Sequence, residues 1–149
     1  YMGDVAEVRA RADTLTHTIE VEDSMAATLR FTSGALGSIV ATTAAAPGFP
    51  HRVEIYGDRG GVQIEGEQIV RWPGKDKEAR EQRVPTDAGA GASPPGISAE
   101  GHIRLVGDLV AAIREGRPPL VPGEEGRRSL ALVIAVYESA RTGQVVRTG

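Results

Sequence analysis

The sequence predicts an α+β fold in which helices cover one face of a large, mostly antiparallel β-sheet. Three observations support this class: alternating patterns recur through the first 84 residues, helical patterns follow residue 98, and one short strand comes last. Because the strands precede the helices rather than alternate with them, the order excludes a doubly wound parallel sheet. At 149 residues the chain is long enough to form one domain, residues 1–149, with its own core.

Two early segments alternate apolar and polar residues, as strands with one solvated face do. The residues predicted to face inward are Ala6, Val8, Ala10 and Ala12 in residues 5–12, and Met25, Ala27, Leu29 and Phe31 in residues 24–32. Ser33-Gly34 then marks a turn, so we expect residues 35–45 to return as the second strand of a hairpin.

Shorter strands are predicted in the middle of the chain, separated by the glycine-containing turns GDRGG and EGEQ. They cover residues 52–56, 61–65, 68–72 and, as a seventh strand, 80–84. Residues 85–97 are almost entirely Gly, Ala, Ser and Pro, with little to bury, and this composition predicts a long mobile loop.

The last third of the chain predicts two helices and a final short strand in QVVRT. The first helix has Ser98 as a candidate N-cap and ends at Gly116, where Pro118-Pro119 prevents its continuation. Its predicted inward residues are Ile103, Val106, Val110 and Ile113. The second helix starts at Glu124-Glu125 and ends at Gly143, with Leu130, Val133, Ile134, Tyr137 and Ala140 predicted to face inward.

Two helices can cover only one face of so large a sheet, so the other face requires a partner. The firm break between the helices, IREGRPPLVPGEEG, ends the first helical pattern and starts the second within a few residues.

Composition limits the classes of partner. The net charge of −3 argues against nucleic acid or an anionic membrane surface, and no apolar run approaches the ~20 residues of a membrane span. Cysteine is absent, which excludes disulfides and thiol chemistry. We expect a soluble cytoplasmic protein, and the strand-like start at Tyr1 indicates a segment of a longer one.

Few residues point to chemistry by their spacing alone. Gly89-Ala90-Gly91 begins a dinucleotide-like pattern, but Pro94 occupies its sixth position and no βαβ unit surrounds it. The three histidines have no metal-like spacing, although His102 lies in the first helical turn beside the predicted loop. Arg52 follows the break PGFP, where it could hold a substrate hydroxyl or carboxylate, or could equally be a solvated edge charge.

The stretch GHIRLVGDLVAAIREGRPPLVPGEEGRRSLALVIAVYESARTGQVV resembles the C-terminal part of the Gfo/Idh/MocA family of glucose–fructose oxidoreductases and inositol dehydrogenases. Its second helix closes on the family's Tyr-x-Ser-x-x-x-Gly pattern, here Tyr137, Ser139 and Gly143. The segments VEDSMAATLRFTSGALGSI and HRVEIYGDRGGVQI are similar to the family's sheet strands. The resemblance implies a dihydrodipicolinate-reductase-like C-terminal domain. It also implies that the break at residues 113–126 folds the two helices back to back over the same sheet face and is not a catalytic loop.

The resemblance also implies that the cofactor-binding and catalytic parts lie outside this sequence. Family enzymes bind NAD or NADP mainly through an N-terminal Rossmann domain with a catalytic Lys-Pro pair, and a helix before the sheet carries a catalytic His and Asp. None of these is in the sequence, so we expect no catalysis, no bound cofactor and no metal in this chain alone. Its expected partners are that Rossmann domain, a small-molecule substrate and a second copy, giving a homodimer or higher homo-oligomer through the open sheet face.

Four residues are the candidate substrate-binding set: Phe49, His51, Arg52 and His102. Alignment to the inositol-dehydrogenase branch puts Phe49 and His102 where that branch has tyrosines that contact the polyol, so a cyclitol substrate is doubtful. Phe49 offers an apolar wall and His102 a hydrogen bond. Residues 85–97 are the candidate lid.

Two functions remain open on the sequence. The first is the substrate-recognition and dimerisation domain of an NAD(P)-dependent oxidoreductase that acts on a sugar, polyol or related hydroxy compound by hydride transfer. The second is a non-catalytic ligand-binding or assembly module, because many sheet domains serve only as interaction surfaces. Upstream sequence encoding a glycine-rich βα turn, a Lys-Pro pair and a His-containing helix would favour the enzyme.

Overall fold

The structure is a computed structural model, and it describes residues 2–46, 48–66, 68–74, 77–81 and 99–148. The chain divides into two compact units, one formed by Tyr1–Ala44 with Ala99–Gly149 and the other by Ala45–Ser98. Each unit contains its own antiparallel four-stranded sheet. The predicted α+β class is therefore confirmed, although the strands form two sheets rather than a single one.

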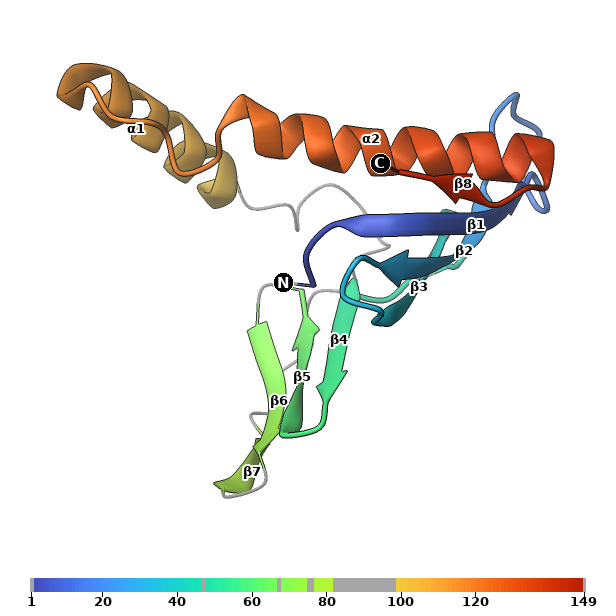
Figure 1. Ribbon diagram of the computed structural model, residues 1–149, viewed down its shortest axis with the longest axis horizontal. Coiled ribbons are helices and arrows are strands. Elements are labelled where there is room, and N and C mark those ends of the chain that lie inside the picture. The colour runs from blue at the N-terminus through green and yellow to red at the C-terminus, as the bar shows by residue number, and fades with distance from the viewer. Residues whose placement is uncertain (1, 47, 67, 75–76, 82–98, 149) are drawn as a thin grey trace. The chain divides into compact units, whose positions relative to one another are not determined.

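The sheet of the first unit has the strand order β3-β2-β1-β8 (Figure 1). Its strands are β1 (Val5–Asp13), β2 (Ser24–Phe31), β3 (Leu36–Thr42) and β8 (Val146–Arg147). Each pair is antiparallel, with Ala10 opposite Ala27 and Ala27 opposite Ile39. Because the side-chain period of a strand is two, this register places the alternating apolar residues of three strands on one face.

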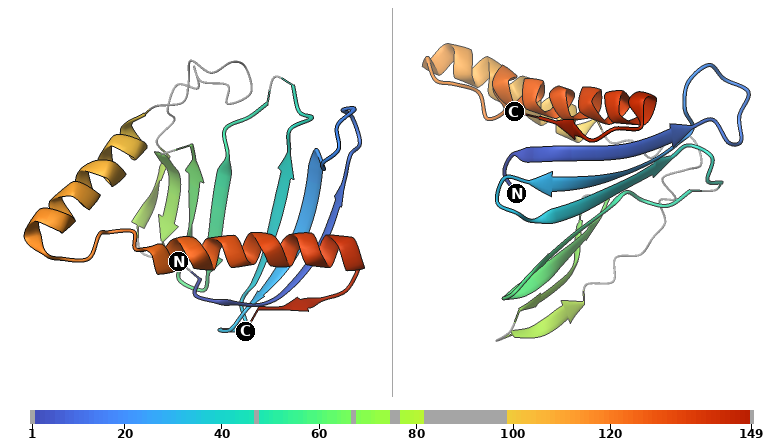
Figure 2. Two further views of the ribbon diagram at one scale, coloured as in Figure 1. Left: turned by 90° about the horizontal axis from the view of Figure 1, so that it is seen from above. Right: turned by 45° about the vertical axis from the view of Figure 1, so that its right-hand side comes forward.

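Helix α2 (Gly123–Thr142) lies across that apolar face, as Figure 2 shows from above. The core consists of Val8, Ala10, Ala27 and Leu29 from the sheet with Ala135 and Val136 from the helix. This confirms the predicted inward face of β2 and that of β1 from Val8 onward, whereas at the irregularity between Val5 and Glu7 it is Val5, not the predicted Ala6, that packs against the core. Full burial of a side chain such as Val8 or Leu29 stabilises the fold by about 1.5–3 kcal/mol.

A buried hydroxyl group fixes the position of α2 on the sheet. Ser139 is fully buried, and its Oγ accepts a hydrogen bond from the Ala10 backbone N–H at 2.9 Å. The same hydroxyl donates to the carbonyl oxygen of Gln144 at 2.6 Å. Gly143 ends the helix in the left-handed conformation, with φ 68°, and its N–H donates to the Ser139 carbonyl.

The predicted inward face of the second helix is wrong in four of its five residues. Leu130, Val133, Ile134 and Tyr137 are each about half exposed, and only Ala140 packs against the core. The face that does contact the sheet carries Ala135, Val136 and Ser139. Small side chains let the helix axis approach β1 closely, which the bulkier residues would prevent.

The break between the helices is held by Asp108 of α1 (Glu100–Glu115). Its carboxylate accepts hydrogen bonds from Arg117 Nη2 at 2.8 Å and from the Leu120 backbone N–H at 2.6 Å. Gly116 ends α1 with φ 65°, as predicted from the sequence. The predicted N-cap Ser98 lies outside the described residues, and Ala99 at the observed cap position makes no side-chain cap hydrogen bond.

The two helices differ in what they cover. Helix α2 contacts β1 and β8, whereas the predicted inward residues of α1 are exposed, including Ile103, Val106 and Ile113. The prediction that both helices cover the same sheet face is therefore correct for α2 and wrong for α1, whose apolar stripe is exposed.

The second unit is a meander of four antiparallel strands in the order β4-β5-β6-β7. These are β4 (Arg52–Gly57), β5 (Gly60–Glu65), β6 (Gln68–Gly74) and β7 (Lys77–Glu81). The first three match the predicted strands closely. The seventh was predicted at residues 80–84 and lies a few residues earlier, and the predicted loop 85–97 falls outside the described residues.

We expect Ser139→Ala to lower the free energy of unfolding by about 1–3 kcal/mol, because it leaves the buried Ala10 N–H and Gln144 carbonyl without their partner. Urea denaturation followed by circular dichroism measures the change. Ser129→Ala is the matched control, since the Ser129 hydroxyl bonds only the Glu125 carbonyl on the exposed side of the same helix. Equal losses in the two variants would contradict the role assigned to Ser139.

Candidate functional site

Arg52, at the start of β4, is held between two carboxylates. Its Nη1 lies 3.4 Å from Glu54 Oε1, and its Nε lies 4.0 Å from Glu65 Oε1 on the neighbouring strand. The antiparallel register places Arg52 directly opposite Glu65, which explains the second pair. The Arg52 side chain is still 58% exposed, so most of its guanidinium N–H groups face outward and can meet a ligand.

Glu54 connects Arg52 to an aromatic residue on the same face of β4. Tyr56 donates a hydrogen bond from its hydroxyl to Glu54 Oε2 at 2.9 Å. This bond to a carboxylate raises the pKa of Tyr56, so the phenol stays protonated and acts as a hydrogen-bond donor at neutral pH. This face of β4 therefore carries the guanidinium of Arg52, the carboxylate of Glu54 and the hydroxyl of Tyr56 in a hydrogen-bonded row.

Phe49 and His51 lie just before β4 and are both exposed, Phe49 by 85%. The carbonyl of His51 accepts a hydrogen bond from the Gly66 N–H at 2.9 Å, which anchors this segment to the end of β5. Three of the four predicted residues thus follow one another at one end of the second sheet. His102 is exposed in the first turn of α1, in the other unit, so its place beside the other three stays a prediction.

Asp23 is a buried carboxylate that organises the loop between β1 and β2. Its oxygens accept hydrogen bonds from the backbone N–H groups of Leu15, Thr16 and His17 at 2.8–2.9 Å, and from the Ser24 hydroxyl at 3.0 Å. The N–H groups of Leu15 and His17 are the main reason that the pKa of Asp23 is held well below its usual range. Asp23 therefore acts as a turn residue directly before the start of β2.

A cavity of about 360 Å³ lies beside Asp23, between α2 and the ends of β2 and β3. Its walls are mostly apolar and include Met25, Ile39, Leu132 and Val136. At its rim, Tyr137 donates a hydrogen bond to Glu22 at 2.5 Å. The cavity was not predicted from the sequence, because the spacing of four residues between Val133 and Tyr137 placed both in the predicted buried face of the helix.

Two kinds of feature are absent from the described part of the chain. Within it, no group of three or more His, Asp or Glu side chains is placed to bind a metal ion. In the same part of the chain, no helix is long and apolar enough to cross a membrane. The carboxylates of Asp23, which is buried, and of Asp108, which is 13% exposed, both accept hydrogen bonds from backbone N–H groups.

These features define an α+β domain. The sheet of its second unit presents polar and aromatic side chains, and helix α2 lies across the sheet of its first unit. The chain belongs to the Gfo/Idh/MocA oxidoreductase family: residues 2–148 match the model of that family's C-terminal alpha/beta domain. The family resemblance found in the sequence is therefore confirmed. No curated protein matches the chain.

Solved structures of dehydrogenases share the fold. The chain is 29% identical to the WlbA dehydrogenase from Bordetella pertussis, solved with NADH and UDP-GlcNAcA, with a TM-score of 0.76 over 98% of this chain. It is 27% identical to the WlbA dehydrogenase from Chromobacterium violaceum, with the same two ligands and a TM-score of 0.76 over 99% of this chain. A levoglucosan dehydrogenase complexed with NADH and L-sorbose, 24% identical over 98% of this chain and 45% of its own, has the same fold at a TM-score of 0.75. The chain spans only 39% and 41% of the two WlbA proteins.

We expect Asp23 to make stability depend on pH below neutrality. Its carboxyl has a lowered pKa in the folded chain and returns to about 3.9 on unfolding, so its contribution is present above about pH 4 and is lost as the pH falls further. Asp23→Asn should therefore be less stable than the parent at pH 7, and the difference should shrink toward pH 2. Thermal unfolding between these pH values measures it.

Asp13→Asn is the control, because the exposed Asp13 carboxylate bonds only the adjacent Thr14 N–H. A constant difference between Asp23→Asn and the parent across the whole range would contradict the assignment.

Proposed function

We propose that this chain is the C-terminal substrate-recognition and dimerisation domain of an NAD(P)-dependent oxidoreductase. Its substrate would be a sugar, a polyol or a related hydroxy compound. The observation that carries the proposal is the family match over residues 2–148, joined to the likeness to dehydrogenases that bind NADH and a sugar nucleotide. The rest of such a protein, including a Rossmann domain for the cofactor, would account for the length of the relatives outside the match.

The reaction would transfer a hydride from a carbinol carbon of the substrate to the nicotinamide, while the hydroxyl proton passes to a base in the rest of the protein. The nicotinamide supplies the hydride acceptor when it is bound. This chain would hold the substrate. Arg52 supports that role because it is ordered by Glu54 and Glu65 yet more than half exposed. Phe49 would provide an apolar wall, and His51 and His102 would provide hydrogen bonds.

We expect the whole protein to reduce NAD⁺ or NADP⁺ in the presence of a suitable sugar, sugar acid or polyol. An increase in absorbance at the wavelength of reduced nicotinamide, screened over a panel that includes a sugar nucleotide, measures this. Residues 1–149 alone should give no signal. If the whole protein binds no nicotinamide cofactor in a fluorescence titration, the non-catalytic binding module becomes the better account.

The same assay tests the candidate substrate-binding residues Arg52 and His102. Arg52→Ala and His102→Ala in the whole protein should each lower kcat/KM by about tenfold or more, because each removes a hydrogen bond made to the substrate. Arg59→Ala removes an exposed arginine from the β4–β5 turn and should leave kcat/KM unchanged. Unchanged kcat/KM in both Arg52→Ala and His102→Ala would remove these residues from the substrate site.

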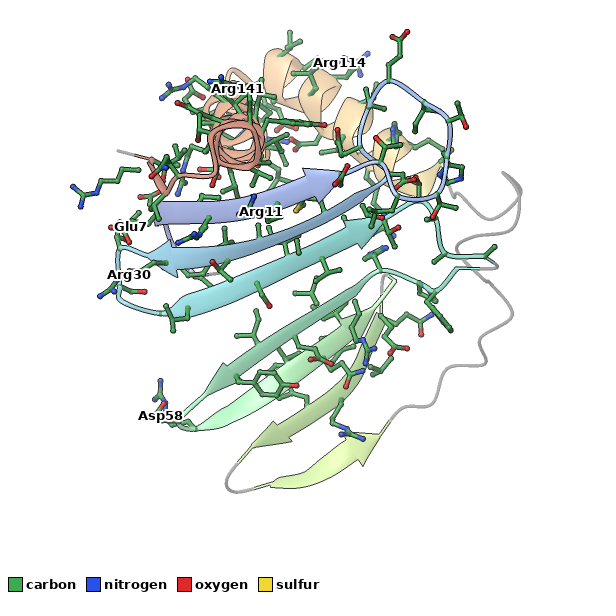
Figure 3. The ribbon with its side chains drawn as sticks, turned by 90° about the vertical axis from the view of Figure 1, so that its right-hand side faces the viewer. Glu7, Arg11, Arg30, Asp58, Arg114 and Arg141 are labelled. Carbon is green, nitrogen blue, oxygen red and sulfur yellow. The ribbon has the colours of Figure 1, made fainter. Side chains whose placement is uncertain are left out.

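The dimer would form through the open face of the first sheet, opposite α2. Strand alternation places Leu36 and Val40 of β3 on that face, and they are 77% and 79% exposed. Charged residues lie on the same face, Arg30 of β2 opposite Leu36 and Glu7 and Arg11 on β1, and Figure 3 labels these three. An apolar centre with a charged rim is the usual composition of a protein–protein interface.

Val40→Glu should therefore shift the whole protein from dimer toward monomer in sedimentation velocity, because an unpaired carboxylate would be buried at the interface. Val40→Thr keeps the branched shape without a charge and should remain dimeric. A dimer that Val40→Glu does not weaken would place the interface on another surface.

A further inference from the structure

The contacts of Arg52 limit the kind of group that it can bind. Nη1 lies 3.4 Å from Glu54 Oε1, and Nε lies 4.0 Å from Glu65 Oε1. A carboxylate ligand pairs best with arginine through two parallel N–H···O bonds along one edge of the guanidinium, either the Nε–Nη2 edge or the Nη1–Nη2 edge. On each of these edges, one nitrogen of Arg52 already faces a carboxylate oxygen of this chain.

The two carboxylates beside Arg52 are themselves held in place. Glu54 Oε2 accepts the hydrogen bond from the Tyr56 hydroxyl at 2.9 Å, so both oxygens of Glu54 have a partner. Glu65 Oε1 accepts a hydrogen bond from the side-chain amide of Gln63 at 3.1 Å. The side chains of Glu54 and Glu65 are 35% and 33% exposed, against 58% for Arg52. The carboxylates would therefore stay beside the guanidinium when a ligand arrives.

The charges on this face of the second sheet are balanced. Arg52 lies opposite Glu65, and Gln63 lies opposite both Glu54 and Arg71, so these side chains share one face. On the described strands β4, β5 and β6, two arginines of this face thus stand against two glutamates. An anionic ligand is attracted by an excess of positive charge, and these side chains provide none.

A hydroxyl group suits the same surroundings better than a carboxylate does. A hydroxyl can accept a hydrogen bond from a guanidinium N–H and donate its own proton to a carboxylate oxygen. Arg52 with Glu54 and Glu65 offers donors and acceptors side by side. A carboxylate ligand could only accept, and it would meet repulsion from both glutamates.

We propose that Arg52, Glu54 and Glu65 bind hydroxyl groups of a neutral sugar or polyol and select against a substrate that carries a carboxylate at this position. This inference rests on the proposed function, in which Arg52 belongs to the substrate site. It decides between the hydroxyl and the carboxylate that the position of Arg52 in the sequence leaves open. The two glutamates thereby become determinants of specificity.

The test compares matched substrates in the whole protein: glucose with glucuronate, and galactose with galacturonate. The members of each pair differ only in a hydroxymethyl group against a carboxylate. The parent should have the higher kcat/KM for the neutral member. The double variant Glu54→Gln with Glu65→Gln should raise the ratio of kcat/KM for the uronate to that for the neutral sugar by about fivefold, the size expected when exposed charges are removed.

Glutamine keeps the size and the hydrogen-bonding oxygen of glutamate, and a purely structural loss would lower kcat/KM for both members alike. The single variants Glu54→Gln and Glu65→Gln cover the case in which the double variant does not fold, and each should shift the ratio less. Asp58→Asn is the control, because it removes a carboxylate from the turn at the opposite end of β4, labelled in Figure 3. Its ratio should equal that of the parent.

A parent that prefers the uronates, or an unchanged ratio in the glutamine variants, would overturn the inference. NADH titration separates it from the proposed function, since absent cofactor binding refutes only the latter. Calorimetric titration of the whole protein with the same pairs then decides the inference without catalysis. Tighter binding of the neutral members would support it, and tighter binding of the uronates, or binding of neither member, would overturn it.

Discussion

The hydrogen bond between the Ala10 N–H and the Ser139 hydroxyl is the contact on which the arrangement of the first unit depends. Strand β8 is two residues long and pairs with β1 only at Glu7 and Val8, so the ladder on this edge stops before Ala10. A buried N–H without a partner is costly, and the helix supplies one in place of a strand. Because the same hydroxyl bonds Gln144, it also joins the end of α2 to the segment that leads into β8.

This contact determines which side of α2 faces the sheet. With Ser139 at the interface, Ala135 and Val136 lie over β1 beside it, and the larger apolar residues turn away. The exposure of Leu130 and Ile134 is thus a consequence of satisfying one backbone donor.

The parts of the fold that could be predicted are those fixed by local physics. The period of two in β1 and β2 identified their inward residues, and glycine at residues 116 and 143 identified both helix ends, where φ is positive. The inward face of α2 was not predictable from apolar spacing, because the contact uses a polar serine and a small alanine. The hydrogen bonds of Asp23 could not be predicted from the sequence, because their donors are backbone N–H groups, which do not depend on residue type.

The candidate site differs in kind, since Arg52 and His102 were selected by their positions in the sequence and Phe49 by the family resemblance. Around Arg52 the structure adds a physical reason, the two carboxylates that order an exposed guanidinium. Two other carboxylates, Asp23 and Asp108, are poorly suited to proton transfer. Hydrogen bonding lowers the pKa of each, so neither is a good base near neutral pH. These two aspartates thus serve the architecture of the first unit: Asp23 fixes the loop before β2, and Asp108 fixes the break between α1 and α2.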